Sequence, residues 1–164
     1  MRYLTAFLLC VLFVSCQVSQ QALKVPVERS HTFNASFDKT WTTLIRVLSD
    51  EAYPFKIMEK GSGILQTDNM SLDVATMEAY STTKSSAGAT YRNNSGTINL
   101  KFFVQSKDSS TTTVQITPYM QGVFFVYKVI ANVDEIHVLE SNGTLEKRLF
   151  DKMGATLRGT KPTV

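Results

Sequence analysis

Few side chains in this sequence have the types and spacing that catalysis or metal binding requires. Its two histidines, His31 and His137, lie far apart along the chain. The segment Asp134-Glu135-Ile136-His137 contains metal-ligand types, but it lacks the second histidine that an HExxH pattern places on the same helical face, and we interpret it as a solvated turn. Serine is abundant, yet no serine lies in a G-x-S-x-G pattern or beside a plausible base. We therefore expect no catalytic residue, no metal site and no cofactor.

The two cysteines, Cys10 and Cys16, both lie at the amino terminus. Arg2 precedes an apolar run, Tyr3–Val14, that contains no charge. This run is shorter than the roughly 20 residues that a membrane-spanning helix needs, and a short apolar run after a basic start is typical of a secretory signal peptide. The alternative, a buried first helix, would lack an amphipathic period. We predict that residues 1–15 are an export signal.

The end of this segment carries a second motif. Phe13-Val14-Ser15-Cys16 resembles the bacterial lipobox, in which an aliphatic residue and two small residues precede an obligatory cysteine. The resemblance implies that Cys16 receives a diacylglycerol, that the signal is cut before Cys16, and that the new amine is acylated. Gln17 follows in place of Asp, which by resemblance to sorted lipoproteins implies the outer membrane, facing the periplasm. The alternative is ordinary cleavage nearby, for example after Ser19, which would leave a secreted protein without an anchor.

Composition limits the remaining classes of protein. The chain has 164 residues, of which 43% are hydrophobic and 19% charged, so one ordinary globular domain fits, and a disordered or fibrous protein does not. Loss of the signal removes Arg2 and lowers the formal net charge from +3 by one. The basic residues are scattered, so no nucleic-acid partner is expected. We divide the chain into a signal (1–15), a lipidated cysteine with a polar tether (16–29), one domain (30–158) and a frayed tail (159–164).

In the first half of the domain, the spacing of apolar residues changes from alternating to helical. His31–Phe37 alternates between apolar and polar residues, which predicts a half-buried strand. Helical spacing of apolar residues then predicts a helix over Phe37–Glu51, with Ser36 as its cap and Pro54 preventing its continuation. The stripe consists of Trp41, Leu44, Ile45 and Leu48. A hairpin of Phe55–Lys60 and Ile64–Thr67 follows, turning at Gly61-Ser62-Gly63.

The second half is expected to be mainly strands. Met70–Tyr80 stays open between a short helix and an irregular edge, and Ser81–Gly96 is predicted to be a long loop, either mobile or functional. Two strands follow over Thr97–Ser106 and Thr111–Thr117, and Pro118 either ends the second strand or marks an edge.

The last part of the chain combines an apolar run with an amphipathic helix. Val123–Val133 is almost continuously apolar and predicts a strand buried on both faces, although a helix or an exposed partner surface is an alternative. The final helix is expected over Gly143–Leu157, capped by Ser141 or Thr144. The aromatic residues expected in the core at strand spacing are Phe102, Phe103, Phe124, Phe125 and Tyr127.

These elements predict an α+β domain, in which an antiparallel sheet packs on helices in the order strand, helix, strands, helix. The segment from Phe33 to Asp68 resembles the opening of BamC-like (NlpB-like) domains of bacterial outer-membrane lipoproteins, and Ser141–Glu146 resembles the start of their final helix. The resemblance implies a helix-grip fold, with a sheet wrapped around the carboxyl-terminal helix. The positions that carry it are Phe37, Asp38, Trp41, Gly63, Ile64 and Thr67.

The sequence therefore favours a non-enzymatic envelope lipoprotein, anchored in the membrane through Cys16. It would act as an interaction or scaffold module in an envelope protein complex, with outer-membrane assembly as the context that the resemblance implies. The surfaces expected to bind a partner are a sheet edge at Pro118–Gly122 and the loop Ser81–Gly96. The alternative is a carrier of a small molecule or lipid, which would need an apolar cavity between the sheet and the final helix.

Overall fold

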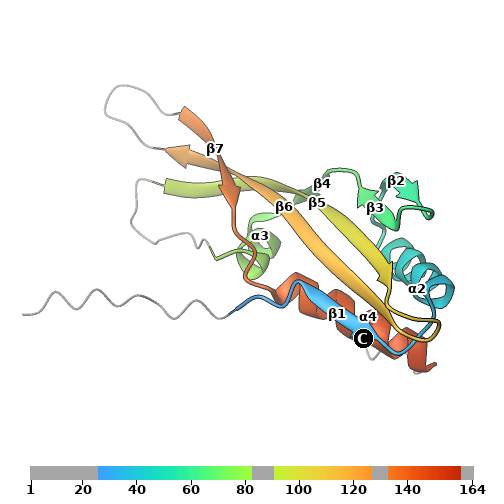
Figure 1. The fold of residues 1–164 in the computed structure, drawn as a ribbon. Coiled ribbons are helices and arrows are strands. Elements are labelled where there is room, and N and C mark those ends of the chain that lie inside the picture. Colours follow the sequence, from blue (N-terminus) through green and yellow to red (C-terminus); the bar gives the residue numbers. More distant parts are fainter. Residues whose placement is uncertain (1–25, 83–90, 127–132, 160–164) are drawn as a thin grey trace, which may run out of the picture.

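A computed structural model describes residues 26–82, 91–126 and 133–159 (Figure 1). These residues form a seven-stranded antiparallel sheet and three helices, so the predicted α+β class, an antiparallel sheet packed on helices, is confirmed. The elements in chain order are β1 (Ser30–Phe33), α2 (Phe37–Asp50), β2 (Phe55–Glu59), β3 (Ile64–Thr67), β4 (Met70–Leu72), α3 (Val74–Tyr80), β5 (Tyr91–Ser106), β6 (Thr112–Val126), β7 (Val133–Leu139) and α4 (Thr144–Arg158).

The centre of the sheet is the long hairpin of β5 and β6. The two strands pair from Tyr91↔Val126 at the open end to Ser106↔Thr112 at the turn. The turn is closed by Asp108, whose side chain accepts hydrogen bonds from the backbone N–H and the hydroxyl of Ser110 at 2.8 and 2.9 Å. These bonds hold the pKa of Asp108 below its usual range.

The shorter strands flank different halves of this hairpin. Near the turn, β1 pairs with β6, while β3 pairs with β5 and carries β2 at its outer edge. Toward the open end, β7 pairs with β6 and β4 pairs with β5. Each half of the hairpin therefore has its own pair of neighbours, and only β5 and β6 run the whole length.

All three helices lie on one face of the sheet (Figure 1). Because successive strand residues alternate between faces, every second residue of β5 and β6 points to the helices. The fully buried side chains of this interface include Leu65, Ile98, Leu100, Phe102, Val114, Ile116 and Met120 from the sheet, and Leu44, Leu48, Met77, Leu145, Leu149 and Met153 from the helices. Burial of each such side chain contributes about 1.5–3 kcal/mol, so this one face carries most of the stability.

An ion cluster joins the end of α2 to α4. The carboxylate of Glu51 accepts hydrogen bonds from both Arg148 and Lys152. The Arg148 guanidinium also lies 5.4 Å from the centre of the Tyr80 ring, so it contacts the end of α3 as well. Burial raises the pKa of Tyr53 beside this cluster, and the charge of Arg148 opposes the rise.

Met70–Tyr80, which the sequence left open between a short helix and an irregular edge, forms a short paired strand followed by a short helix. Its first three residues form β4, and α3 begins after Asp73. The Asp73 carboxylate accepts a hydrogen bond from the Thr76 N–H at 2.7 Å, which caps the helix and lowers the pKa of Asp73. The side chain of Met77 then packs where Gly96 and Gly122 face each other across the hairpin.

The predicted cap of the first helix and the predicted last element differ in detail from the structure. Ser36 is the cap residue of α2, but its side chain makes no capping hydrogen bond. At α4 the cap residue is Gly143, and the side chains just before it satisfy the helix N–H groups: Ser141 accepts from Gly143 and Asn142 accepts from Thr144. Gly159, predicted as part of a frayed tail, ends α4 in a left-handed conformation with φ +74°.

Two predicted strands and one predicted loop have the wrong boundaries. The strand expected over His31–Phe37 ends at Phe33, since the Ala35 carbonyl accepts from the Thr112 hydroxyl as the chain turns into α2. The loop expected over Ser81–Gly96 is wrong in its last six residues, which belong to β5, while residues 83–90 lie outside the described residues. The strand expected over Val123–Val133 instead covers the end of β6, an undescribed stretch, and the first residue of β7.

Pro118 lies inside β6 and does not end it. Proline has no N–H to donate, and at this position an N–H would face a part of the strand edge that has no partner strand among the described residues. The N–H of Ile116, which shares the orientation of residue 118, points away from β5 and donates to the carbonyl of Arg29 at 2.8 Å. Pro118 itself falls between the residues of β6 that pair with β1 and those that pair with β7. The alternative that Pro118 marks an edge position is therefore correct.

We predict that Gly63→Ala destabilises the hairpin of β2 and β3. Gly63 has φ +71°, and a Cβ there would lie 2.1 Å from the carbonyl oxygen of Val104, so the contact between β3 and β5 would have to open. We expect the free energy of unfolding to fall by at least about 2 kcal/mol in urea titrations. Gly61→Ala is the matched control, because nothing lies within 4 Å of a Cβ there. Equal stability of the two variants would contradict this assignment.

The cap of α3 predicts a pH dependence. The pKa of Asp73 is lower in the folded protein than the value of about 3.9 expected in the unfolded chain, so ionised Asp73 stabilises the fold above that value. This contribution is lost as the pH falls through the folded pKa. Asp73→Ala should therefore lower the melting temperature at pH 7, and its difference from the unmodified chain should shrink below about pH 4.

The control for this measurement is Asp134→Ala, which removes an exposed carboxylate from β7, where it caps no helix. This variant should melt close to the unmodified chain at both pH values. A difference for Asp73→Ala that stays the same in acid would rule out the ionised cap.

Candidate docking surfaces

Cys16, the predicted lipidation site, lies outside the described residues, so its modification stays a prediction. The last part of the predicted tether does contact the domain. The carbonyl of Arg29 accepts from Ile116, and a Cβ placed on Gly143 would lie 3.1 Å from Cγ1 of Val27. The chain therefore enters the domain beside the start of α4.

The two histidines do not form a common site. On β1, His31 lies 2.9 Å from Glu28 and stacks on Phe150, with ring centres 5.3 Å apart. His137 lies on β7, with Nε2 3.3 Å from Oε2 of Glu135. Asp134–His137 is thus strand and not the solvated turn that we expected. Among the residues that the structure describes, no group of three or more His, Cys, Asp or Glu side chains could hold a metal ion.

Within the described residues, most of the edge and the ends of the loop that the sequence proposed for partners are paired with other segments, while Pro118 and Tyr119 fall between the residues that pair with β1 and those that pair with β7. Residues Met120–Gly122 pair with β5 on one side and with β7 on the other. Ser81 forms a bridge with Ser141, and the Thr82 N–H donates to the carbonyl of Glu140 at 2.9 Å. The face of the sheet is therefore a better candidate for a partner surface than this edge.

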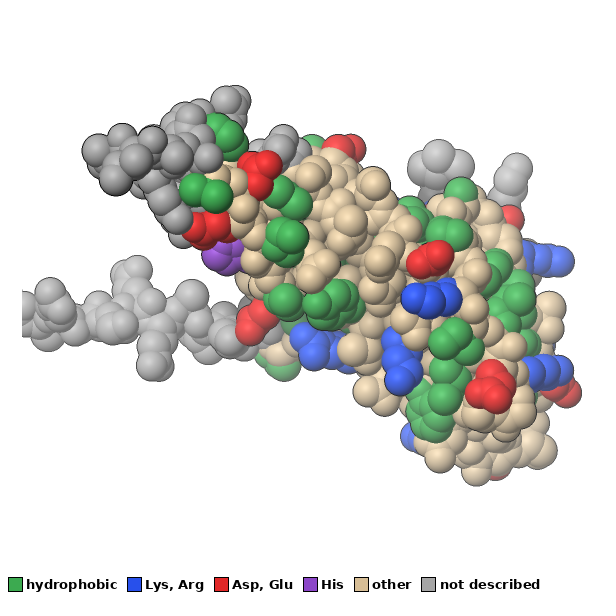
Figure 2. Space-filling model, turned by 90° about the horizontal axis from the view of Figure 1, so that it is seen from above, with side chains coloured by type: hydrophobic (Ala, Val, Ile, Leu, Met, Phe, Trp, Pro, Cys, Tyr) green, Lys and Arg blue, Asp and Glu red, His purple; other side chains and the backbone are tan. Residues whose placement is uncertain are grey.

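The face of the sheet opposite the helices exposes large apolar side chains. Seen from above the view of Figure 1, hydrophobic side chains reach the surface at the end that carries β7 and at the opposite end (Figure 2). Charged and polar side chains lie among them. Strand register groups the exposed residues of the two ends into separate regions.

At the end with β7, four outward residues form what we call the β6–β7 patch. Its members are Tyr119, Val123, Ile136 and Val138. Val123 lies directly opposite Ile136, and Val138 lies opposite Gln121, whose amide donates to the Tyr119 hydroxyl at 3.1 Å. Ile136 and Val138 are 69% and 65% exposed, and Tyr119 is 46% exposed.

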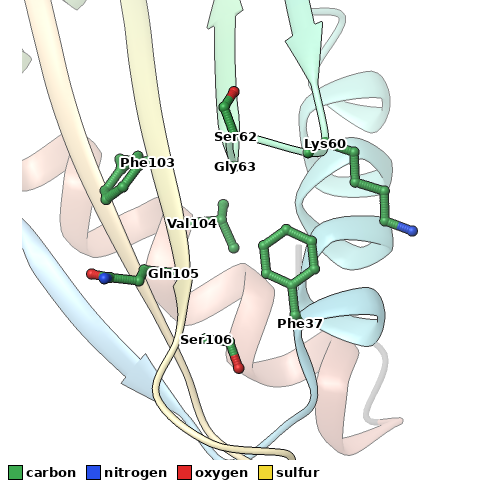
Figure 3. Close-up of a pocket in the computed structure, with 9 residues that line it drawn as sticks. Phe37, Lys60, Ser62, Gly63, Phe103, Val104, Gln105 and Ser106 are labelled. Atoms are coloured by element: carbon green, nitrogen blue, oxygen red, sulfur yellow. The ribbon is translucent and has the colours of Figure 1, made fainter.

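At the other end, an open groove of about 590 Å³ lies between the start of α2, the turn from β2 to β3, and β5 (Figure 3). The rings of Phe37 and Phe103 line it together with Lys60, which forms an ion pair with Asp38 at 2.7 Å. Phe103 is 41% exposed, so the expectation that it belongs to the core is wrong. Phe102, its neighbour on the strand, is fully buried, as alternation requires.

The groove has no arrangement for catalysis among its lining residues. The hydroxyl of Ser62 donates to the backbone carbonyl and the carboxylate of Glu59, and the hydroxyl of Ser106 donates to the carbonyl of Asp108. Both hydroxyls therefore serve to close turns. Ser62 has only the carboxylate of Glu59 beside it, and neither hydroxyl donates to a histidine.

Comparison of the sequence with models of protein families and with curated proteins finds no match. The resemblance to BamC-like domains therefore depends only on the sequence positions given above. Within the described ranges, no helix combines the length and the apolar character needed to cross a membrane.

Proposed function

We propose that this chain is a non-enzymatic lipoprotein of the bacterial cell envelope, anchored through Cys16 at the outer membrane and facing the periplasm. The observation that carries the proposal is the motif Phe13-Val14-Ser15-Cys16, placed directly after an uncharged apolar run. Each buried acyl methylene contributes about 0.8 kcal/mol to membrane binding, so one chain binds weakly and two or more give a stable anchor. The fold then needs no membrane span of its own.

An anchor of this kind restricts where the domain can be. Residues 16–25 connect the lipidated cysteine to the described residues, and fully extended they span at most about 35 Å. The domain therefore stays close to the inner surface of the outer membrane. A module held there meets envelope proteins at a raised effective concentration, so weak contacts are sufficient for its function.

The interaction role is supported by the uncovered face of the sheet. Exposed apolar side chains that group on one face are typical of surfaces that bind a partner. This face carries Phe103 and Ile57 at one end and the β6–β7 patch at the other. Outer-membrane assembly is the context that the BamC-like resemblance favours for such a partner.

The carrier alternative requires an apolar cavity between the sheet and α4. That space is filled by Phe102 and Ile116 from the sheet and by Leu149 and Met153 from the helix, all fully buried. A carrier would have to expel these side chains to admit a ligand. We therefore propose the interaction module alone.

The anchor predicts a difference between the two cysteines. In a Gram-negative host, Cys16→Ser should move the full chain out of the detergent-soluble outer-membrane fraction or leave it unprocessed, because the acylated thiol is lost. Cys10→Ser is the matched control, since residue 10 lies in the predicted signal and should leave processing and fractionation unchanged. If both variants fractionate like the unmodified chain, the anchor at Cys16 is wrong.

The proposed partner surface predicts that crosslinking depends on which face of the domain carries the crosslinker. A photo-crosslinking amino acid at Phe103, on the uncovered face, should form adducts with envelope proteins in intact cells. The same group at Asp151, which is exposed on the helical side, should form few. Adducts of equal yield at both positions, or only between copies of this chain, would contradict the proposed surface.

A further inference from the structure

We propose that the β6–β7 patch lies against the zwitterionic lipid surface of the membrane in which the chain is anchored. This inference rests on the proposed anchor at Cys16 and adds an orientation to it: the end of the domain with β7 faces the lipid, and the groove at Phe103 faces away.

The tether leaves the domain close to the β6–β7 patch. Val27 lies next to Gly143, and the chain runs from there back to Val138 in only five residues. Val138 is therefore within about 17 Å of this exit, since a strand rises about 3.4 Å per residue. The groove lies near the far end of the hairpin (Figures 1 and 3). A tether of at most about 35 Å brings the patch to the bilayer more readily than it brings the groove there.

The side chains of the patch have the chemistry of a membrane interface. Three of its four members are aliphatic, and Tyr119 has an apolar ring with a hydroxyl that already accepts a hydrogen bond from Gln121. Tyrosine with an apolar body and a polar tip is enriched at membrane interfaces. Among the side chains that the structure describes, two charged residues flank the patch on the same face: Asp134, which lies opposite Phe125, and Lys101, which lies opposite Thr117 in the pair next to Tyr119. One acidic and one basic neighbour leave no net charge to attract anionic lipid, so the chemistry fits a zwitterionic surface.

The patch is small. Four side chains that are only partly exposed offer roughly a few hundred Å², whereas a stable protein interface buries about 800 Å² on each partner. The patch is too small to hold a second copy of the chain. It is sufficient for a membrane contact, because the lipid anchor already supplies the affinity and the patch has only to orient the domain.

The mature chain makes a direct test possible, because Cys16 would be acylated and it has no other cysteine. A bimane label at V138C reports on the patch, and the same label at F103C is the matched control at the other end. Each full-length lipoprotein is reconstituted into phosphatidylcholine vesicles with and without lipids that carry bromine on their acyl chains. Since interfacial side chains reach about 5–10 Å into the bilayer, bromine should lower emission at position 138 by about twofold and leave position 103 unchanged.

Quenching that is equal at the two positions, or absent at 138, would overturn the inference. Excimer emission from pyrene at position 138 would also overturn it, since that signal requires a second copy at the patch. I136C serves as a second label site if V138C does not fold, which circular dichroism decides. The mass of each reconstituted sample separates the two proposals: a lipidated chain without quenching at 138 or 136 fails only this inference, whereas an unlipidated chain fails the proposed function as well.

Discussion

The register between β5 and β6 is the constraint on which the rest of the structure depends. Because side chains alternate along a strand, a shift of one residue would move Leu100 and Phe102 to the solvent face and Phe103 into the core. The turn at Asp108 and the Gly96–Gly122 pair fix this register at two separate points. The helices can then pack on one face, and the shorter strands can flank either half of the hairpin.

One consequence of this arrangement is that the two ends of the sheet have different roles in the proposed function. The helices leave the second face uncovered, and the short flanking strands divide it into a region around Phe103 and the β6–β7 patch. The exit of the tether beside Gly143 gives the two regions different distances from the proposed anchor. A single folded domain can thereby present one surface to lipid and another to a protein partner.

The sequence predicted the elements that are specified by residues close together in the chain. The stripe that includes Trp41 specifies α2, and Gly61-Ser62-Gly63 specifies the hairpin of β2 and β3. It did not predict β7, because five of its seven residues are exposed and its acidic and apolar residues resemble a polar loop. Only pairing with β6 makes β7 a strand.

The candidate surfaces were harder to predict than the fold. An exposed Phe103 and a buried Phe102 have the same local sequence preference, and only the register decides which one reaches solvent. The proposed anchor does not depend on register. Phe13–Cys16 is a contiguous motif that processing enzymes would recognise in an unfolded chain. A contiguous motif can therefore be recognised without the fold, whereas the exposed side chains on the face of the sheet cannot.

The central claim, that Cys16 is the acylated first residue of the mature chain, is tested most directly by the intact mass of the protein extracted from membranes. The account predicts a chain that begins at Cys16 and carries a diacylglycerol and an amide-linked acyl group. An unmodified chain that begins elsewhere, for example after Ser19, would contradict it.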